Sequence, residues 1–137
     1  MTGPVLAVDL GGTNMRAAIV DADGTITLRV SEPTPHDAPC PAALQQLMAS
    51  VRDRGGGPGT FEAVVVGVPG RVNHAAGRLE HAPNLPAGWA AELTEAELAR
   101  HFVAEVYLAN DADLAAVGEA HFGAGRAFTD IVYITIS

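Results

Sequence analysis

The chain contains no lysine, and Cys40 is the single cysteine among its 137 residues. All eight basic residues are therefore arginines, which excludes a phosphate-binding lysine and a Schiff-base lysine within this chain. One cysteine excludes an intrachain disulfide and a zinc site built on cysteine thiolates. The five histidines are scattered along the chain without metal-ligand spacing, so surface or core positions are favoured for them.

Basic charge and long apolar runs are also scarce. The formal net charge is −8 and the isoelectric point is near 4.9, which argues against non-specific binding to nucleic acid or to anionic membranes. No apolar run has the length of a transmembrane helix. Asp9 interrupts the apolar residues near the N-terminus, where a signal peptide would carry no charge. We expect a cytoplasmic protein without a membrane or nucleic-acid partner.

The composition and length indicate one globular domain. Hydrophobic residues make up 48% and charged residues 18% of the chain, which is typical of a folded protein, and 137 residues fit a single domain. Three short apolar segments separated by tight turns, at 5–10, 15–20 and 25–30, predict an antiparallel meander.

Strands and helices alternate after the meander. Helical spacing covers 42–52, 94–102 and 111–122, a hairpin is expected over 71–80, and further strands are expected at 61–68, 103–109 and 131–136. This order predicts an α/β fold, with a mixed sheet and helices on its faces. The last apolar run reaches the end of the chain without a turn or cap. We expect the natural sequence to continue, the alternative being a domain that ends there.

The turn Gly11-Gly12-Thr13-Asn14 joins the first two predicted strands. One interpretation is a plain hairpin turn in which the glycines supply positive φ. The other is a nest of backbone N–H groups that binds phosphate oxygens. Asp9, at the end of an apolar strand, would be costly without compensation and would lie where it could hold a hydrated Mg²⁺.

The segment Asn110-Asp111-Ala112-Asp113 lies where a strand meets a helix. Asn and Asp are favoured N-cap residues, so any of the three polar residues could cap the helix. Alternatively, Asp111 points into a cleft and acts as a general base on a hydroxyl group. Both interpretations hold if one residue caps and another catalyses.

Two further segments have features of a ligand site. Gly70 follows a buried strand, where a missing side chain lets a ligand approach the backbone. Asn84 carries an amide that both donates and accepts, as sugar hydroxyls require, and Trp89 could form a pocket wall. The alternative is a rigid proline-rich surface loop with Trp89 as a local core residue, and this alternative is favoured by the segment alone.

Taken in order, these segments resemble the N-terminal domain of the ROK family of sugar kinases and repressors, and its glucokinase-like members in particular. The similarity extends from end to end of the chain and comprises Asp9-Leu-Gly-Gly-Thr-Asn-Met-Arg16, Gly67-Val-Pro-Gly70, Asn84-Leu85-Pro86 with Trp89, Asn110-Asp111-Ala112-Asp113 through Gly118-Glu119, and the closing run VYITIS. Each segment alone is a weak signal, whereas together, in this order and spacing, they are a specific one.

The resemblance implies a ribonuclease H-like fold of the actin and hexokinase type, and ATP-dependent phosphorylation of a hexose, with glucose as the default. It implies that Gly11, Gly12, Thr13 and Asn14 contact ATP phosphates and that Asp9 lies near Mg²⁺. It implies a sugar site formed by Gly70, Asn84, Asn110 and Asp111, in which Asp111 is the catalytic base. The hexose and the phosphate donor stay open, since mannose, N-acetyl sugars and polyphosphate are used by relatives.

The similarity also implies further segments of the protein that residues 1–137 do not include. Family members continue into a second glycine-rich phosphate turn, an adenosine-binding half and often a zinc loop, so we expect this chain to be an N-terminal domain that is inactive alone. A sugar-sensing repressor is disfavoured because the first strand begins almost at Met1, without a preceding DNA-binding unit, and the charge is acidic. A non-catalytic ligand-binding or assembly domain is a third possibility. An exposed final strand would allow a homodimer.

Overall fold

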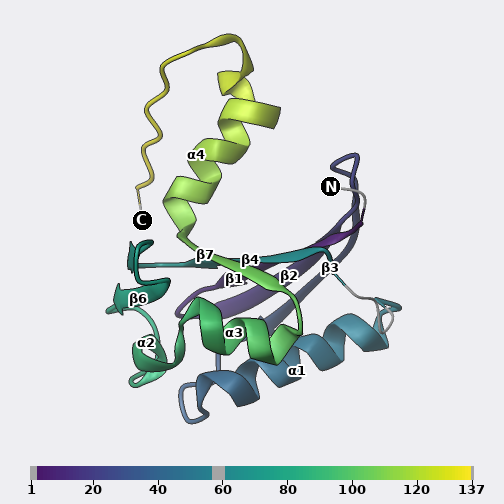
Figure 1. Ribbon diagram of the computed structural model, residues 1–137, viewed down its shortest axis with the longest axis vertical. Helices are drawn as coiled ribbons and strands as arrows, with labels where there is room; N and C mark the ends of the chain where they lie inside the picture. Colours follow the sequence, from purple (N-terminus) through teal and green to yellow (C-terminus); the bar gives the residue numbers. More distant parts are fainter. Residues whose placement is uncertain (1–2, 57–60, 137) are drawn as a thin grey trace.

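The computed structural model describes residues 3–56 and 61–136. Its centre is a mixed sheet with strand order β3-β2-β1-β4-β7 (Figure 1). The five strands are β1 (Val5–Leu10), β2 (Asn14–Val20), β3 (Ile26–Pro33), β4 (Ala63–Val68) and β7 (Glu105–Asn110). The predicted meander is confirmed, because β2 pairs antiparallel with both β1 and β3. The predicted mixed sheet is confirmed too, because β1 pairs parallel with β4, and β4 with β7.

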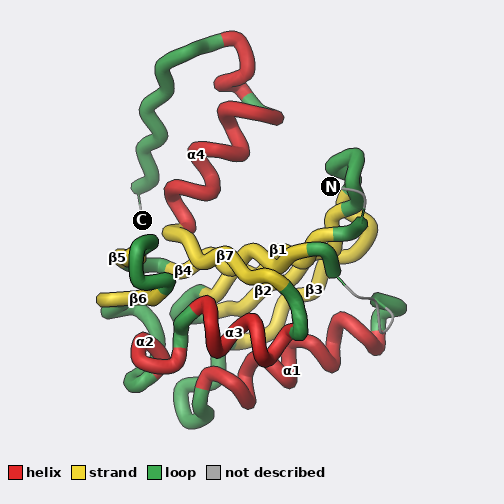
Figure 2. The backbone as a smooth tube through the Cα atoms, viewed as in Figure 1, coloured by secondary structure: helices red, strands yellow, loops and turns green. Residues whose placement is uncertain are grey.

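Helices α1 (Cys40–Asp53) and α3 (Glu95–Phe102) lie on one face of the sheet (Figures 1 and 2). Side chains of a strand alternate between its faces, so Leu6, Val8 and Leu10 of β1 point into the core beneath these helices and are at most 3% exposed. α1 contributes Leu44, Leu47 and Val51 to the same core, as its spacing predicted. Among the described helices, none has the length and apolar composition needed to cross a membrane.

The N-terminus of α1 is capped by a distant residue. Pro39 stands at the N-cap and provides no side-chain bond, and the Cys40 N–H donates instead to Glu92 Oε2 at 2.8 Å. Burial, with a smaller contribution from the Glu92 carboxylate, raises the pKa of the Cys40 thiol to about 12. The thiol therefore stays protonated at neutral pH and is not a nucleophile.

The segment before α3 includes a short helix that the sequence did not predict, α2 (Trp89–Glu92). Trp89 is 1% exposed, and its indole N–H donates to the Ala38 carbonyl at 3.0 Å. The suggestion that Trp89 forms a pocket wall is therefore wrong, and its alternative as a local core residue is confirmed.

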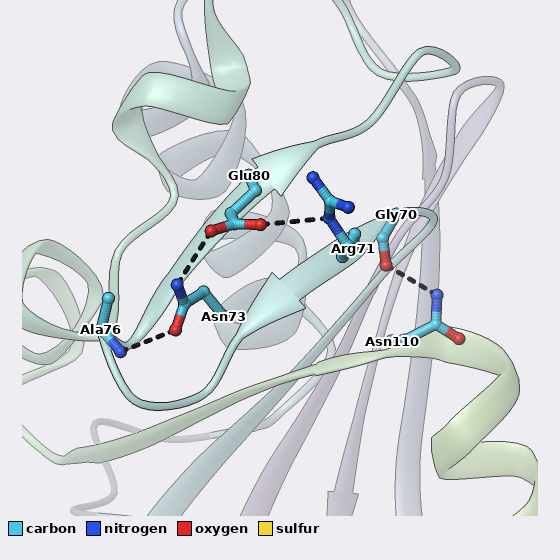
Figure 3. A network of polar contacts seen from close by, with 6 residues as sticks. All are labelled: Gly70, Arg71, Asn73, Ala76, Glu80 and Asn110. Atoms are coloured by element: carbon cyan, nitrogen blue, oxygen red, sulfur yellow. Dashed lines mark hydrogen bonds and ion pairs between the residues drawn. The ribbon is translucent and has the colours of Figure 1, made fainter.

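The predicted hairpin over 71–80 is formed by β5 (Arg71–Asn73) and β6 (Arg78–His81) (Figure 3). Asn73 binds at both ends of its amide, donating to Glu80 Oε1 at 2.8 Å and accepting the Ala76 N–H at 3.1 Å. Arg71 pairs with the other Glu80 oxygen at 3.1 Å. The Asn73 bond, followed by nearby arginine charge, lowers the pKa of Glu80.

The prediction of a final strand at 131–136 is wrong. After α4 (Asp111–Phe122), which leads away from the sheet, and η1 (Ala124–Ala127), the chain turns back and runs beside α4 in the direction of the sheet without joining it (Figure 1). A strand needs a neighbour for its backbone hydrogen bonds, and no described strand lies beside this segment. Its apolar side chains are exposed, as are Val117 and Phe122 of α4.

Helix α3 has a favourable N-cap and a strained C-cap. Thr94 is its N-cap, as predicted, and accepts the Glu97 N–H at 3.1 Å. Its C-cap is Val103, which has φ +53° and ψ +43°. The left-handed conformation strains residues with a β-branched side chain by roughly 1–2 kcal/mol. With 88% of Val103 exposed, little packing offsets this strain.

We expect Val103→Gly to increase the free energy of unfolding by up to about 1 kcal/mol, because relief of strain exceeds the greater backbone entropy that glycine loses on folding. Urea unfolding measures the change. Val132→Gly is the matched control, since Val132 is 85% exposed and has no positive φ. Equal effects of the two substitutions would contradict the account of strain at Val103.

Candidate functional site

The three parallel strands bring distant polar segments to one edge of the sheet. Parallel strands have their carboxyl ends at the same edge, where ligand sites of α/β folds form. In the register, Asp9 of β1 lies opposite Gly67 of β4, and Val68 of β4 lies opposite Asn110 of β7. The Gly11–Asn14 turn follows β1 directly and α4 follows β7 directly, so both are placed at this edge.

Gly11 and Gly12 are required because backbone carbonyl groups lie too close to them to leave room for a side chain. Neither Gly11 nor Gly12 has a positive φ, so the interpretation that they supply this conformation is wrong. The Gly11 N–H donates to the Asn14 carbonyl at 3.0 Å, and a Cβ on Gly11 would lie 2.7 Å from that oxygen. A Cβ on Gly12 would lie 2.2 Å from the Asn84 carbonyl oxygen. The turn therefore packs tightly against the Asn84 loop.

Asp9 is compensated by a partner that the sequence argument did not identify. Arg16 lies opposite Asp9 in the β1–β2 pairing, and its Nη1 donates to Asp9 Oδ2 at 2.9 Å. The Asp9 side chain is 43% exposed, so this carboxylate is accessible beside the turn.

The surroundings of Asp9 fit a hydrated Mg²⁺. This ion keeps several waters and usually needs only one or two protein carboxylates when phosphates supply other ligands. Residues 3–56 and 61–136 contain no group of three or more His, Cys, Asp or Glu arranged to hold a metal. A site at Asp9 would therefore depend on water and phosphate oxygens.

Asn110 caps α4 and connects two predicted parts of the site. Its Oδ1 accepts the N–H groups of Ala112 at 2.9 Å and Asp113 at 3.2 Å. Its Nδ2 donates to the Gly70 carbonyl at 2.8 Å (Figure 3). The capping role is confirmed for Asn110. Asp111 Oδ1 also accepts the Ala112 N–H, at 2.8 Å, so its other carboxylate oxygen is the one without a contact to the start of α4.

Asp111 is exposed on the sheet face opposite α1. It lines a cavity of about 620 Å³ with Asp9, Arg16 and Gly67. A Cβ on Gly67 would lie 3.2 Å from the Leu114 side chain and 3.9 Å from the Asp111 Cα, so this glycine lets the start of α4 approach β4. The structure thus places the two predicted carboxylates, Asp9 and Asp111, along one cavity.

Gly70 and Asn84 lie outside the lining of that cavity. A Cβ on Gly70 would lie 2.1 Å from the His81 carbonyl oxygen, so its small size serves the packing of the hairpin. Asn84 is exposed, and its amide has no partner among residues 3–56 and 61–136. Its backbone joins the site through the contact with Gly12.

Besides Arg16, two residues at this edge were not predicted from the sequence, Thr34 and His36. Each bonds a carbonyl of the glycine turn, Thr34 that of Gly11 and His36 that of Gly12. They belong to the proline-rich segment 31–41, which lies between the third predicted strand and the first predicted helix. β3 runs to Pro33, three residues beyond the predicted end, and so carries Thr34 to the turn.

A family model described as "ROK family" matches residues 5–137. The chain belongs to the ROK family. The glucokinase of Thermotoga maritima is 32% identical over 134 residues, which are 96% of this chain and 41% of that protein. The chain thus spans about two fifths of the length of the curated relatives it matches.

Solved ROK structures share the fold. A glucokinase from Streptomyces griseus, crystallised with glucose and AMPPNP, has a TM-score of 0.74 and 32% identity, covering 90% of this chain and 38% of its own. A polyphosphate/ATP-glucomannokinase from Arthrobacter has a TM-score of 0.73 and 32% identity, covering 90% of this chain and 50% of its own. The expected hexokinase-type fold is confirmed.

Packing of the turn against the Asn84 loop predicts a stability effect. Gly12→Ala should lower the free energy of unfolding by about 1–3 kcal/mol, because its methyl group would overlap a backbone carbonyl that has to move. Gly118→Ala is the matched control in α4, where an added Cβ meets nothing within 4 Å. That change should stabilise the protein by up to about 1 kcal/mol. The measurement is urea unfolding. A urea midpoint of Gly12→Ala equal to that of the wild type would contradict the tight packing of Gly12 against the Asn84 loop.

Proposed function

We propose that this chain is the N-terminal part of an ATP-dependent hexose kinase, with glucose as the first substrate to test. The observation that carries the proposal is the common edge of β1, β4 and β7, where the glycine turn, Asp9 and Asp111 lie together. The glucokinase relatives support the reaction class. The Streptomyces griseus glucokinase was crystallised with glucose and AMPPNP, which supports a sugar and ATP as the substrates.

Phosphoryl transfer depends on positioning and on stabilising negative charge. In the proposed enzyme, the backbone N–H groups around Gly12 and Thr13 receive phosphate oxygens of ATP, with Gly11 and Asn14 completing the turn. Asp9 would hold Mg²⁺ through water, and the ion would supply neutralisation of phosphate charge. Arg16, which pairs with Asp9, would then share that carboxylate with the hydrated ion.

Asp111 is the proposed general base. It is exposed at the start of α4, where Asn110 accepts two N–H groups of the helix and Asp111 Oδ1 accepts one of the same two. Its carboxylate accepts the proton of the attacking sugar hydroxyl. Gly70, Asn84 and Asn110 are the other proposed sugar-site residues, and the bond from Asn110 to Gly70 holds two of them together.

The remaining parts of the enzyme are expected from a continuation of the chain. Because the relatives are longer, we infer that a second phosphate turn and the opposite wall of the cleft follow residue 137. We infer a cytoplasmic location and no nucleic-acid partner. We also propose a homodimer, formed through the exposed apolar segment 131–136.

The test measures ADP release with Mg²⁺, ATP and a panel of hexoses, on this chain and on a version extended along its native reading frame. In the extended protein, Asp111→Asn should lower kcat by about 10²- to 10⁴-fold with little change in the hexose KM, because only the proton acceptor is lost. The Arthrobacter relative is a polyphosphate/ATP enzyme, so polyphosphate is included as a donor.

Asp113→Asn is the matched control. Asp113 lies in the same first turn of α4 and loses the same charge, so it should retain kcat within a few fold. A kcat of Asp111→Asn within tenfold of the wild type, or equal losses in both variants, would contradict the role of Asp111 as the base.

A further inference from the structure

Thr34 is the one buried polar residue in the described part of the chain, with 6% of its surface exposed. Its hydroxyl donates to the Gly11 carbonyl oxygen at 2.6 Å, and its backbone N–H donates to the Thr13 carbonyl at 2.9 Å. A buried hydroxyl group needs a hydrogen-bond partner. Here that partner is the glycine turn, which lies 23 residues earlier in the chain.

His36 makes a second bond of the same kind. Its Nε2 lies 2.9 Å from the Gly12 carbonyl oxygen. Because a carbonyl oxygen only accepts, the imidazole carries a hydrogen on Nε2. Thr34 and His36 together therefore hold the carbonyl groups of three consecutive residues of the turn.

These bonds fix the direction of the N–H groups. In a trans peptide the N–H points opposite to the C=O of the same unit, and no described peptide bond is cis. The carbonyls of Gly11 and Gly12 share their peptide units with the N–H groups of Gly12 and Thr13. Both N–H groups therefore face away from Thr34 and His36, and neither donates to any group within residues 3–56 and 61–136.

Adjacent unpaired N–H groups that face the same side form a nest for an anion. A Gly-Gly segment without restraint has many conformations, and ordering it on binding would reduce affinity. The bonds from Thr34 and His36 order the turn before a ligand arrives.

We propose that Thr34 and His36 are positioning residues that aim the N–H groups of Gly12 and Thr13 at a phosphate of the nucleotide. The inference rests on the proposed function, since it assigns the turn to phosphate. It adds two residues outside the turn that determine the affinity for ATP without contacting the sugar.

The first test removes each donor in the extended protein. Thr34→Val and His36→Leu should each raise the KM for ATP about three- to tenfold, as loss of one hydrogen bond predicts, with the hexose KM unchanged. Thr34→Ser and His36→Gln keep a donor and should restore most of the loss. His74→Leu, at an exposed histidine in the β5–β6 turn, is the matched control and should match the wild type.

The second test does not need catalysis. The amide NMR signals of Gly12 and Thr13 should shift when pyrophosphate or Mg²⁺–AMPPNP is added to the ¹⁵N-labelled protein. The midpoint should move to about three- to tenfold higher concentration in Thr34→Val and His36→Leu. If Thr34→Val does not fold, His36→Leu still tests the proposal, because His36 is exposed.

The outcomes separate this inference from the kinase proposal. Amides that shift as expected in a protein that phosphorylates no hexose would support the positioning role and refute the kinase. An active enzyme in which both variants keep the wild-type KM for ATP would overturn the positioning role. Parallel increases in the ATP and hexose KM, or amides that neither probe shifts, would overturn it too.

Discussion

Parallel pairing of β1, β4 and β7 is the constraint on which the rest of the site depends. The pairing sets Asp9 beside Gly67, and Val68 beside Asn110, although these residues lie far apart in the sequence. A register shift of one residue would turn each side chain to the other face. Asp9 would then face the apolar core beneath α1, where an unpaired carboxylate is costly. The sheet therefore stabilises the fold and orients the functional groups through the same hydrogen bonds.

Contacts between segments distant in sequence give the edge its detailed shape. Gly12 lies against the Asn84 carbonyl, Gly70 against that of His81, and Gly67 beneath Leu114. None of these glycines has a positive φ. Each leaves room for a neighbouring group, so a side chain at any of them would displace a loop or α4. The Gly11–Asn14 turn is thus fixed from two sides, by the Asn84 loop and by Thr34 and His36.

Local patterns predicted most of the fold. Period-2 and helical spacing gave β1, β2 and α1 close to their observed bounds, since these elements bury one face and turn the other outward. The bounds of α4 were predicted too, although none of its residues is buried. The apolar run at 131–136 has the composition of a strand but no neighbour to pair with, and composition alone does not reveal a missing partner. The short helix α2 was missed because it is held by the bond from the Trp89 indole to the Ala38 carbonyl, a tertiary contact.

Only some residues of the candidate site were predicted, because the roles of the others depend on tertiary contacts. Asp9, the glycine turn and Asp111 were found because their residue types are unusual at the end of an apolar strand. Arg16, Thr34 and His36 were missed because their roles arise from pairing across strands and between loops. Such contacts depend on register and strand length, which a single sequence does not determine.

The central claim is that one edge of this sheet binds both substrates and places a sugar hydroxyl at Asp111. The most direct measurement is a crystal structure of the extended protein with glucose and AMPPNP. The account predicts an Asp111 carboxylate oxygen within about 3 Å of a sugar hydroxyl, with phosphate oxygens on the N–H groups of Gly12 and Thr13. Sugar or nucleotide bound away from this edge, with Asp111 in contact with neither, would contradict it.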